Sequence, residues 1–145
     1  MTALALLVIC LGLLMLAGRG LASGAQGDLL GVRFGGDGQR TRVVIDLERA
    51  TQGRVIEDGT QGQVILSLLE VAAGRGASGE GSGLVRSYRV GAQGEASRVQ
   101  LDLAKNGEIE RRFLLPPGDG VGHYRYVVDL KATGAAASAA ARSIP

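Results

Sequence analysis

Cysteine and histidine are almost absent from this 145-residue chain, and their scarcity excludes several kinds of site. The one cysteine, Cys10, lies in an apolar run at the N-terminus, so the rest of the chain has no thiol for a disulfide or a metal. The one histidine, His123, has no histidine or cysteine partner for a zinc site and gives no basis for a Ser-His-Asp triad. We expect no catalytic residue, no metal ligand and no cofactor, and interpret His123 as a solvated turn residue.

Aromatic residues and lysine are also scarce, which argues against nucleic acid as a partner. Tryptophan is missing and aromatic residues make up 3% of the sequence, so no ladder of rings is available for stacked bases. Lys105 and Lys131 are the only lysines, and the 16 basic side chains are nearly balanced by 14 acidic ones. Because there is no basic block, the sequence pI of about 9.0 does not indicate nucleic-acid binding.

Glycine is abundant instead, with 24 residues, and a short phrase is repeated. The phrase occurs at residues 42–47 (RVVIDL), 98–103 (RVQLDL) and 125–130 (RYVVDL). Around the first two copies the likeness is longer, because residues 31–50 align without a gap with residues 87–106. An internal repeat of this kind indicates one folding unit used twice.

Each copy of the phrase tends to alternate apolar and polar side chains. In the first copy, Val43, Ile45 and Leu47 fall on one face of an extended chain. A period of two predicts a strand with one buried face and does not fit a helix. Val44 and Val127 interrupt the polar side, so we expect those two strands to be partly covered on both faces.

Short turns and further alternating stretches predict the rest of the fold. Glycine-bearing turns at residues 35–38 and 91–94 indicate that each half opens with a hairpin. The expected strands are 29–34, 42–47, 54–57 and 63–69 in the first half, and 84–90, 98–103, 108–114 and 124–130 in the second. The low-complexity stretch 72–83 is expected to be a mobile loop. The predicted fold class is all-β, a pseudo-symmetric sandwich of two four-stranded antiparallel sheets.

The two ends of the chain differ in composition from its middle. Residues 4–16 are apolar except for Gly12, a run shorter than the roughly 20 residues of a bilayer-spanning helix. We interpret residues 1–25 as a helical signal peptide cleaved after Ala22 or Ala25, with an uncleaved N-terminal anchor as the alternative. The protein is then exported and contacts the membrane only through this segment. Residues 26–131 are the predicted domain, and the alanine-rich residues 132–145 a flexible linker.

Several of these stretches resemble a known family. Residues 32–34 and 41–47 look like the opening of an AMIN domain, and residues 113–117 and 124–130 like its close. The resemblance implies a sandwich of two four-stranded sheets, in a periplasmic protein of the cell envelope. AMIN domains are best known at the N-terminus of N-acetylmuramoyl-L-alanine amidases, where they bind peptidoglycan and direct the enzyme to the division septum. They also occur in secretins.

The order of signal, AMIN-like domain and linker is similar to the front of such an amidase. Those enzymes cleave an amide with zinc held by His and Glu side chains, and this chain has a single histidine. We expect either the front portion of an amidase or a module derived from one, which binds peptidoglycan during cell division and wall turnover. The alternative is a protein-interaction module of an envelope assembly such as a secretin, which docks through an exposed sheet edge.

Five arginines are the candidate ligand-binding residues: Arg33, Arg42, Arg89, Arg98 and Arg125. They are expected at related places on the solvent faces of the two sheets. Peptidoglycan carries carboxylates on its stem peptides, and an arginine can grip a carboxylate through two parallel hydrogen bonds. The competing interpretation is that the arginines of the repeated phrase pair across strands with its aspartates or with nearby glutamates.

The tyrosines are a second candidate surface, because their rings can stack on sugars. Alternation places Tyr88 and Tyr126 on the apolar faces of their strands, so we expect both to pack in the core. Tyr124 lies at a strand end, where alternation does not decide its direction.

Overall fold

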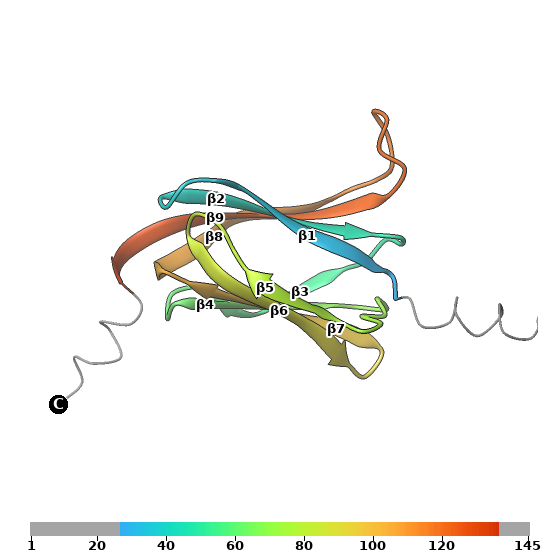
Figure 1. The fold of residues 1–145 in the computed structure, drawn as a ribbon, viewed down its shortest axis with the longest axis horizontal. Coiled ribbons are helices and arrows are strands. Elements are labelled where there is room, and N and C mark those ends of the chain that lie inside the picture. Colours follow the sequence, from blue (N-terminus) through green and yellow to red (C-terminus); the bar gives the residue numbers. More distant parts are fainter. Residues whose placement is uncertain (1–26, 137–145) are drawn as a thin grey trace, which may run out of the picture.

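Nine strands and no helix make up residues 27–136, the part of the chain that the computed structural model describes (Figure 1). They are β1 (Leu29–Gly36), β2 (Arg40–Leu47), β3 (Gly53–Asp58), β4 (Gln63–Leu68), β5 (Ala77–Glu80), β6 (Val85–Gln93), β7 (Ala96–Leu103), β8 (Lys105–Leu115) and β9 (Tyr124–Ala136). All eight expected strands are present, so the all-β prediction is confirmed. The predicted signal helix at residues 1–25 lies outside the described residues.

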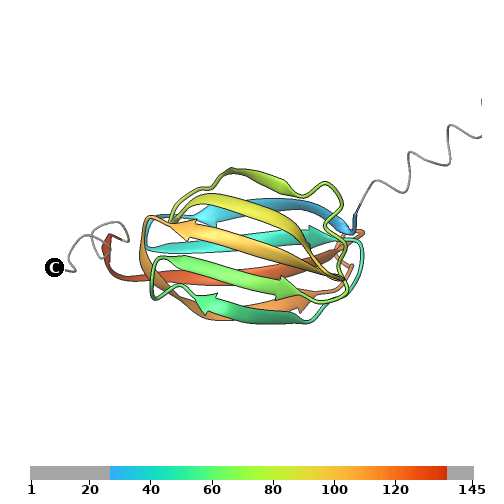
Figure 2. The same ribbon diagram turned by 90° about the horizontal axis from the view of Figure 1, so that it is seen from below.

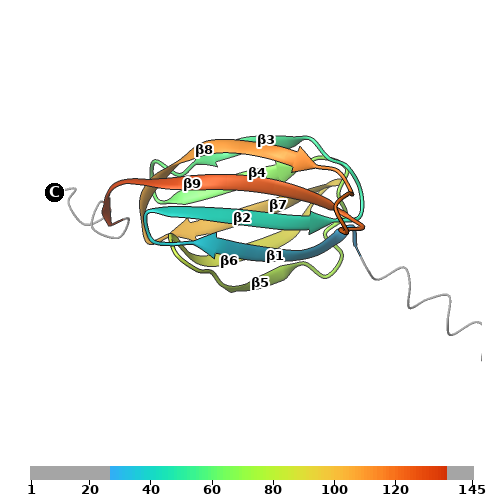
Figure 3. The same ribbon diagram turned by 90° about the horizontal axis from the view of Figure 1, so that it is seen from above.

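The strands form two antiparallel sheets that lie face to face (Figure 2 and Figure 3). Sheet A has the strand order β1-β2-β9-β8, and sheet B has the order β3-β4-β7-β6-β5. Each half of the chain contributes one hairpin to each sheet: β1–β2 and β8–β9 share sheet A, whereas β3–β4 and β6–β7 share sheet B. The sandwich is therefore built from interleaved halves, and sheet B has one strand more than expected.

The internal repeat reappears in the strand register. In hairpin β1–β2, Phe34 pairs with Val43, and in hairpin β6–β7, Val90 pairs with Val99, which occupy the same positions of the repeat. Both hairpins also have a register irregularity near the start of their first strand. The two aligned segments thus have the same strand pairing, one in each sheet.

Glycine and an aspartate shape the first of the two predicted turns. Gly36 has a φ of 105°, in the left-handed region that glycine adopts without steric cost. The carboxylate of Asp37 accepts hydrogen bonds from the backbone N–H groups of Gln39 (2.9 Å) and Arg40 (3.0 Å). Side-chain capping of this kind is a common way for aspartate to stabilise a turn.

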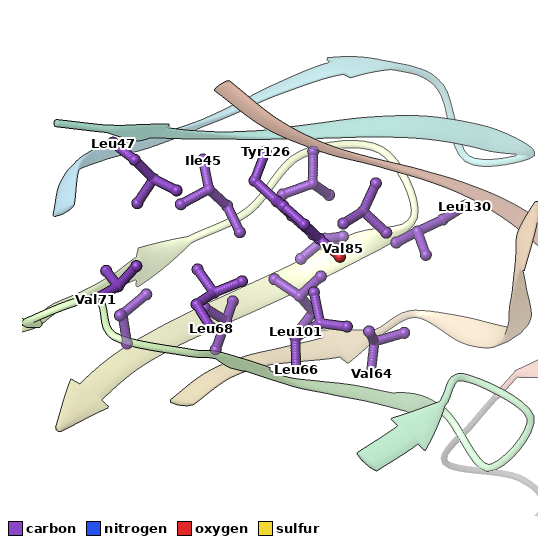
Figure 4. Close-up of a cluster of buried hydrophobic side chains, with 14 of the residues drawn as sticks. Ile45, Leu47, Val64, Leu66, Leu68, Val71, Val85, Leu101, Tyr126 and Leu130 are labelled. Atoms are coloured by element: carbon purple, nitrogen blue, oxygen red, sulfur yellow. The ribbon is translucent and has the colours of Figure 1, made fainter. Parts of the chain in front are cut away.

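Apolar side chains from both sheets meet between them (Figure 4). The largest fully buried ones include Ile45, Leu47 and Leu130 from sheet A, and Leu66, Leu68, Leu101 and Leu103 from sheet B. Val71, which follows β4, and Leu84, which precedes β6, extend this core. Burying one such side chain contributes about 1.5–3 kcal/mol, so the alternating pattern supplies most of the driving force for the sandwich.

Tyr126 closes one side of the sandwich. It is 3% exposed, and its ring lies against Gly53 of β3, where an added Cβ would collide with the ring. Arg112 of β8 donates hydrogen bonds to the carbonyl oxygen of Gly53 (2.8 Å) and to the hydroxyl of Tyr126 (2.9 Å). A single guanidinium group thus joins β3 and β8, the edge strands of the two sheets on this side.

The tyrosine predictions are confirmed. Tyr126 is buried in the core, and Tyr88 is partly buried against it, with its ring centroid 5.5 Å from that of Phe34. Tyr124, which the sequence left open, also packs against the core.

Two stretches that were expected to lack regular structure form strands. The predicted mobile loop, residues 72–83, contains β5, which pairs with β6 from Ala77↔Val90 to Glu80↔Ser87. The predicted linker, residues 132–145, begins inside β9, which pairs with β8 as far as Ala136; the rest of that segment lies outside the described residues. Both additions consist mainly of small residues held by backbone pairing, and such pairing leaves little apolar alternation in a sequence.

Candidate functional site

The five predicted arginines lie on the outer faces of the sandwich, but their surroundings differ between the two sheets. Arg33, Arg42 and Arg125 belong to sheet A, and Arg89 and Arg98 to sheet B. Each follows the alternation of its strand, opposite in direction to the buried side chains of the core. The partners of these five side chains decide which of them are available to a ligand.

Arg42 is paired with a carboxylate of its own sheet. Its guanidinium donates two hydrogen bonds to Asp129 of β9, at 2.8 and 3.0 Å, and Arg111 of β8 donates a third at 2.7 Å. Hydrogen bonds from Arg42 above all, and also from Arg111, outweigh the effect of burial and lower the pKa of Asp129 to about 2. The cross-strand pairing that competed with ligand binding is therefore confirmed for Arg42.

An apolar strip lies beside this cluster on the outer face of sheet A. Phe113 has the guanidinium carbons of Arg42 and Arg111 at 5.8 and 5.3 Å from its ring centroid. Its cross-strand neighbour Val127 is only 2% exposed, and Val44 is partly buried. This confirms that the strands of these two valines are partly covered on both faces.

Arg33 is likewise paired, with an aspartate that the sequence did not suggest. Arg33 donates two hydrogen bonds to Asp46, at 2.7 and 2.9 Å, and Nε2 of His123 lies 2.9 Å from the same carboxylate. Burial favours a raised pKa at Asp46, but the hydrogen bonds from Arg33 and His123 together outweigh it, and the pKa is lowered. The prediction that His123 is merely solvated is wrong: Asp46 holds it, because the turn before β9 lies beside β2.

Arg125, like Arg98, is partly buried. It is the cross-strand partner of Asp46 in the β2–β9 ladder, yet it forms no ion pair with it. Its Nε is buried and has no hydrogen-bond partner. The competing interpretation, pairing of Arg125 with an aspartate, is therefore wrong, since Arg33 and His123 already occupy the Asp46 carboxylate.

Sheet B satisfies its corresponding aspartate, Asp102, with neutral groups. Gln63 donates to it at 2.9 Å, Ser87 at 3.1 Å and Gln100 at 3.5 Å. The hydrogen bond from Gln63 is the main cause of a lowered pKa at Asp102, and burial opposes it. Because these donors occupy the carboxylate, Arg89, which corresponds to Arg33, has no partner there.

Arg98 also forms no ion pair within the described residues, so the competing interpretation, cross-strand pairing, fails for Arg98 as well. Its neighbour across the strand pair is Ser67 of β4, and beyond Ser67 lies Arg54 of β3. Among the described residues, Arg54, Arg89 and Arg98 form no ion pair. The outer face of sheet B therefore presents three guanidinium groups that no carboxylate of residues 27–136 neutralises.

A shallow hollow lies between two of these arginines. It has a volume of about 190 Å³ and is lined by Arg89, Gly91, Ala92, Arg98 and Gln100. Gly91 lacks a side chain at the pair position opposite Arg98, which opens the floor of the hollow. The hollow thus offers two cationic walls and one amide to an oxygen-bearing ligand.

A larger hollow, of about 680 Å³, lies elsewhere, between loops at one end of the sandwich. Its polar lining includes Gln52, Glu70 and Glu95 and no basic residue. Two glutamates repel a carboxylate, so size does not make this hollow the better candidate for an acidic ligand. Within residues 27–136 no three His, Cys, Asp or Glu side chains are grouped so as to hold a metal ion.

Sequence reasoning missed Arg54 and Ser67. Alternation with Gly53 and Val55 already directs Arg54 outward, and this signal was available. Their place beside Arg98 depends on the pairing of β3, β4 and β7, which follows from the interleaved sheet order and not from any local pattern.

Comparison with known proteins adds no identification. No protein-family model matches the chain, and no curated protein matches it significantly in sequence. In the described part of the chain, no helix has the length and apolarity to cross a membrane.

Proposed function

We propose that this protein is an exported module that binds peptidoglycan noncovalently through the outer face of sheet B. The observation that carries the proposal is the contrast between the two faces. Arg33 and Arg42 on sheet A are neutralised by aspartates, whereas Arg54, Arg89 and Arg98 on sheet B have no acidic partner in the described residues. Stem peptides of peptidoglycan supply carboxylates that such guanidinium groups bind.

The biological setting of the proposal comes from the AMIN-like stretches and the N-terminal segment. They favour a periplasmic location and a role in placing an N-acetylmuramoyl-L-alanine amidase on the wall, as its front portion or as a module derived from one. In this role the domain supplies affinity for the wall and no catalytic group.

Sedimentation with purified peptidoglycan sacculi tests the proposal. We expect the protein to pellet with sacculi at low salt and to be released as salt screens the charges. The double variant Arg89→Gln and Arg98→Gln should remain in the supernatant. The matched control, Arg40→Gln with Arg111→Gln on sheet A, removes the same charge and should still pellet. A folded wild-type protein that stays in the supernatant at low salt, or equal losses in both double variants, would contradict the proposal.

A second candidate function, docking of an envelope protein, is favoured by one edge of the sandwich. β6 is covered along its outer side by β5, whereas no strand of the described part of the chain lies on the outer side of the corresponding strand β1. Leu30, on this edge, is 49% exposed. An open strand edge can accept an extended segment of another protein. Crosslinking from position 30 in cells should then recover protein, and recovery of glycan alone would exclude this function.

A further inference from the structure

On the outer face of each sheet, three side chains from neighbouring strands form a row, and the two rows differ only in the central residue. In sheet A, Asp129 of β9 lies between Arg42 of β2 and Arg111 of β8. In sheet B, Ser67 of β4 lies between Arg98 of β7 and Arg54 of β3. Arg42 and Arg98 are the same position of the internal repeat. The rows therefore match arginine for arginine, and a serine stands in sheet B where sheet A has an aspartate.

Sheet A shows how this arrangement treats a carboxylate. The carboxylate of Asp129 receives three hydrogen bonds of 2.7–3.0 Å from the two arginines, and its side chain is 15% exposed. Its pKa is lowered to about 2, chiefly by Arg42, so the site holds the anion strongly against protonation. Two arginines on either side of a central strand thus converge on one carboxylate.

Sheet B has the two corresponding arginines, Arg54 and Arg98, but no carboxylate between them. Ser67 is 8% exposed, and none of the side-chain hydrogen bonds found among the described residues involves its hydroxyl. Arg54 is exposed and Arg98 half-buried, and neither forms an ion pair within residues 27–136. The nearest acidic residue of the face by register is Glu57, whose partner in β4 is Ile65, and it forms no ion pair either.

We infer that Arg54, Ser67 and Arg98 form a receptor site for a carboxylate that a ligand supplies. The ligand carboxylate occupies the place that the Asp129 carboxylate has in sheet A, bound by both guanidinium groups and by the hydroxyl of Ser67. This inference deepens the proposed function and rests on it for the source of the ligand, a stem-peptide carboxylate. A carboxylate of a protein partner has the same chemistry, so the test must separate the two sources.

Acetate is the minimal probe for the site itself. In ¹⁵N NMR spectra of the protein, acetate should shift the side-chain Nε–Hε signals of Arg54 and Arg98 in a saturable way, and leave those of Arg42 and Arg111 unchanged. Ser67→Asp supplies the missing carboxylate internally and should weaken acetate binding at least about tenfold. The control Ser67→Asn changes size without charge and should retain most of the binding. Absent shifts in the wild type, or equal binding in Ser67→Asp, would overturn the inference.

The reverse substitution offers a gain of function. Asp129→Ser converts the row of sheet A into that of sheet B, so the number of acetate sites should rise from one to two. Persistence of a single site in a folded Asp129→Ser protein would contradict the inference. If this variant does not fold, the Ser67→Asp experiment still tests the inference. That variant should fold, because the matching row of sheet A already contains an aspartate, Asp129.

Two further experiments distinguish the existence of the site from the identity of its ligand. A short peptide with a free C-terminal D-alanine carboxylate should bind better than its C-terminal amide, because only the free acid supplies the anion; equal binding of the two forms would overturn the inference. Ser67→Asp should also abolish pelleting with sacculi. Pelleting that survives, without acetate binding in the wild type, would leave the proposed function standing and refute this site. Acetate binding without pelleting would support this carboxylate site and refute the proposed binding to peptidoglycan.

Discussion

At the scale of single residues, a few differences between the repeats decide which arginines are neutralised. Asp129 on sheet A corresponds to Ser67 on sheet B, and Arg42 is paired while Arg98 is not. Around the second aspartate, Gln63 takes the place that Arg125 has beside Asp46. The two copies of the repeat therefore share their strand pairing and core positions, but their aligned arginines are neutralised on the outer face of sheet A and not on that of sheet B.

Asp129 should stabilise the fold in a pH-dependent way. Because its pKa is lowered from 3.8 to about 2, its contribution is full above about pH 4 and disappears as the pH falls towards 2. With half-exposed arginine partners, we expect Asp129→Asn to lower the free energy of unfolding by about 1–2 kcal/mol at pH 7. Urea denaturation at low salt and several pH values measures this, because urea does not screen the ion pair. The variant and wild type should converge near pH 2, whereas a difference independent of pH would refute the ion-pair origin. Glu108→Gln, at an exposed site, is the control.

Gly53 should tolerate no side chain, since its Cβ position is occupied by the Tyr126 ring. Gly53→Ala must displace that ring and disturb the hydrogen bonds from Arg112, so we expect a loss of about 2 kcal/mol in unfolding free energy. The control is Gly35→Ala, where an added Cβ meets nothing within 4 Å. Thermal denaturation of both variants would show the contrast, and equal melting temperatures would disprove the role of this contact.

At the scale of elements, alternation predicted the hairpins well and the added strand poorly. β7 buries every second residue, which is the pattern that its sequence shows. β5, with the sequence ASGE, has only Ala77 packed against the core, so it carries no periodic signal. Its existence depends on the free edge of β6, and such a long-range cause cannot be seen in residues 72–83 themselves.

Hydrogen exchange should reveal β5 as a paired strand at the edge of sheet B. We expect amides of β5 that face β6 to exchange more slowly than those on its outer side, and all of them faster than amides of the central strand β7. The comparison needs only one set of exchange spectra at a single pH. Uniformly fast amide exchange across residues 77–80 would contradict a paired strand β5 and support the mobile loop predicted from the sequence.

The candidate site was predictable only in part. Outward arginines follow from the period of two, and the sequence named Arg89 and Arg98 for this reason. The partners did not follow, because Arg33 reaches Asp46 through the register of β1 with β2, and Ser67 faces Arg98 through the pairing of β4 with β7. Facing side chains depend on sheet order, and sheet order is set by packing of the whole domain.

At the scale of the whole molecule, the interleaved hairpins make the halves dependent on one another. Sheet A takes β1 and β2 from the first half and β8 and β9 from the second, so neither half has a complete sheet. Most pairings between halves are also distant in sequence, which slows folding. The duplicated unit is thus a unit of sequence and not an independent domain.

Separated halves should therefore be unfolded alone. We expect fragments 27–73 and 74–136 each to show no cooperative unfolding transition, because each exposes half of the core. An equimolar mixture should regain the β-sheet circular dichroism of the intact chain and a single transition. A fragment that unfolds cooperatively by itself would contradict the interleaved architecture.

The strand order of sheet A also determines how the domain would respond to tension. β1 and β9 flank β2, both antiparallel to it, and the beginning of β1 and the end of β9 lie at opposite ends of the sheet (Figure 1). A stretching force between these ends slides β1 and β9 along β2, so that all the ladder hydrogen bonds resist together instead of opening one by one. Resistance of this kind would suit the proposed wall-binding function, because a cell wall stretches and relaxes with turgor.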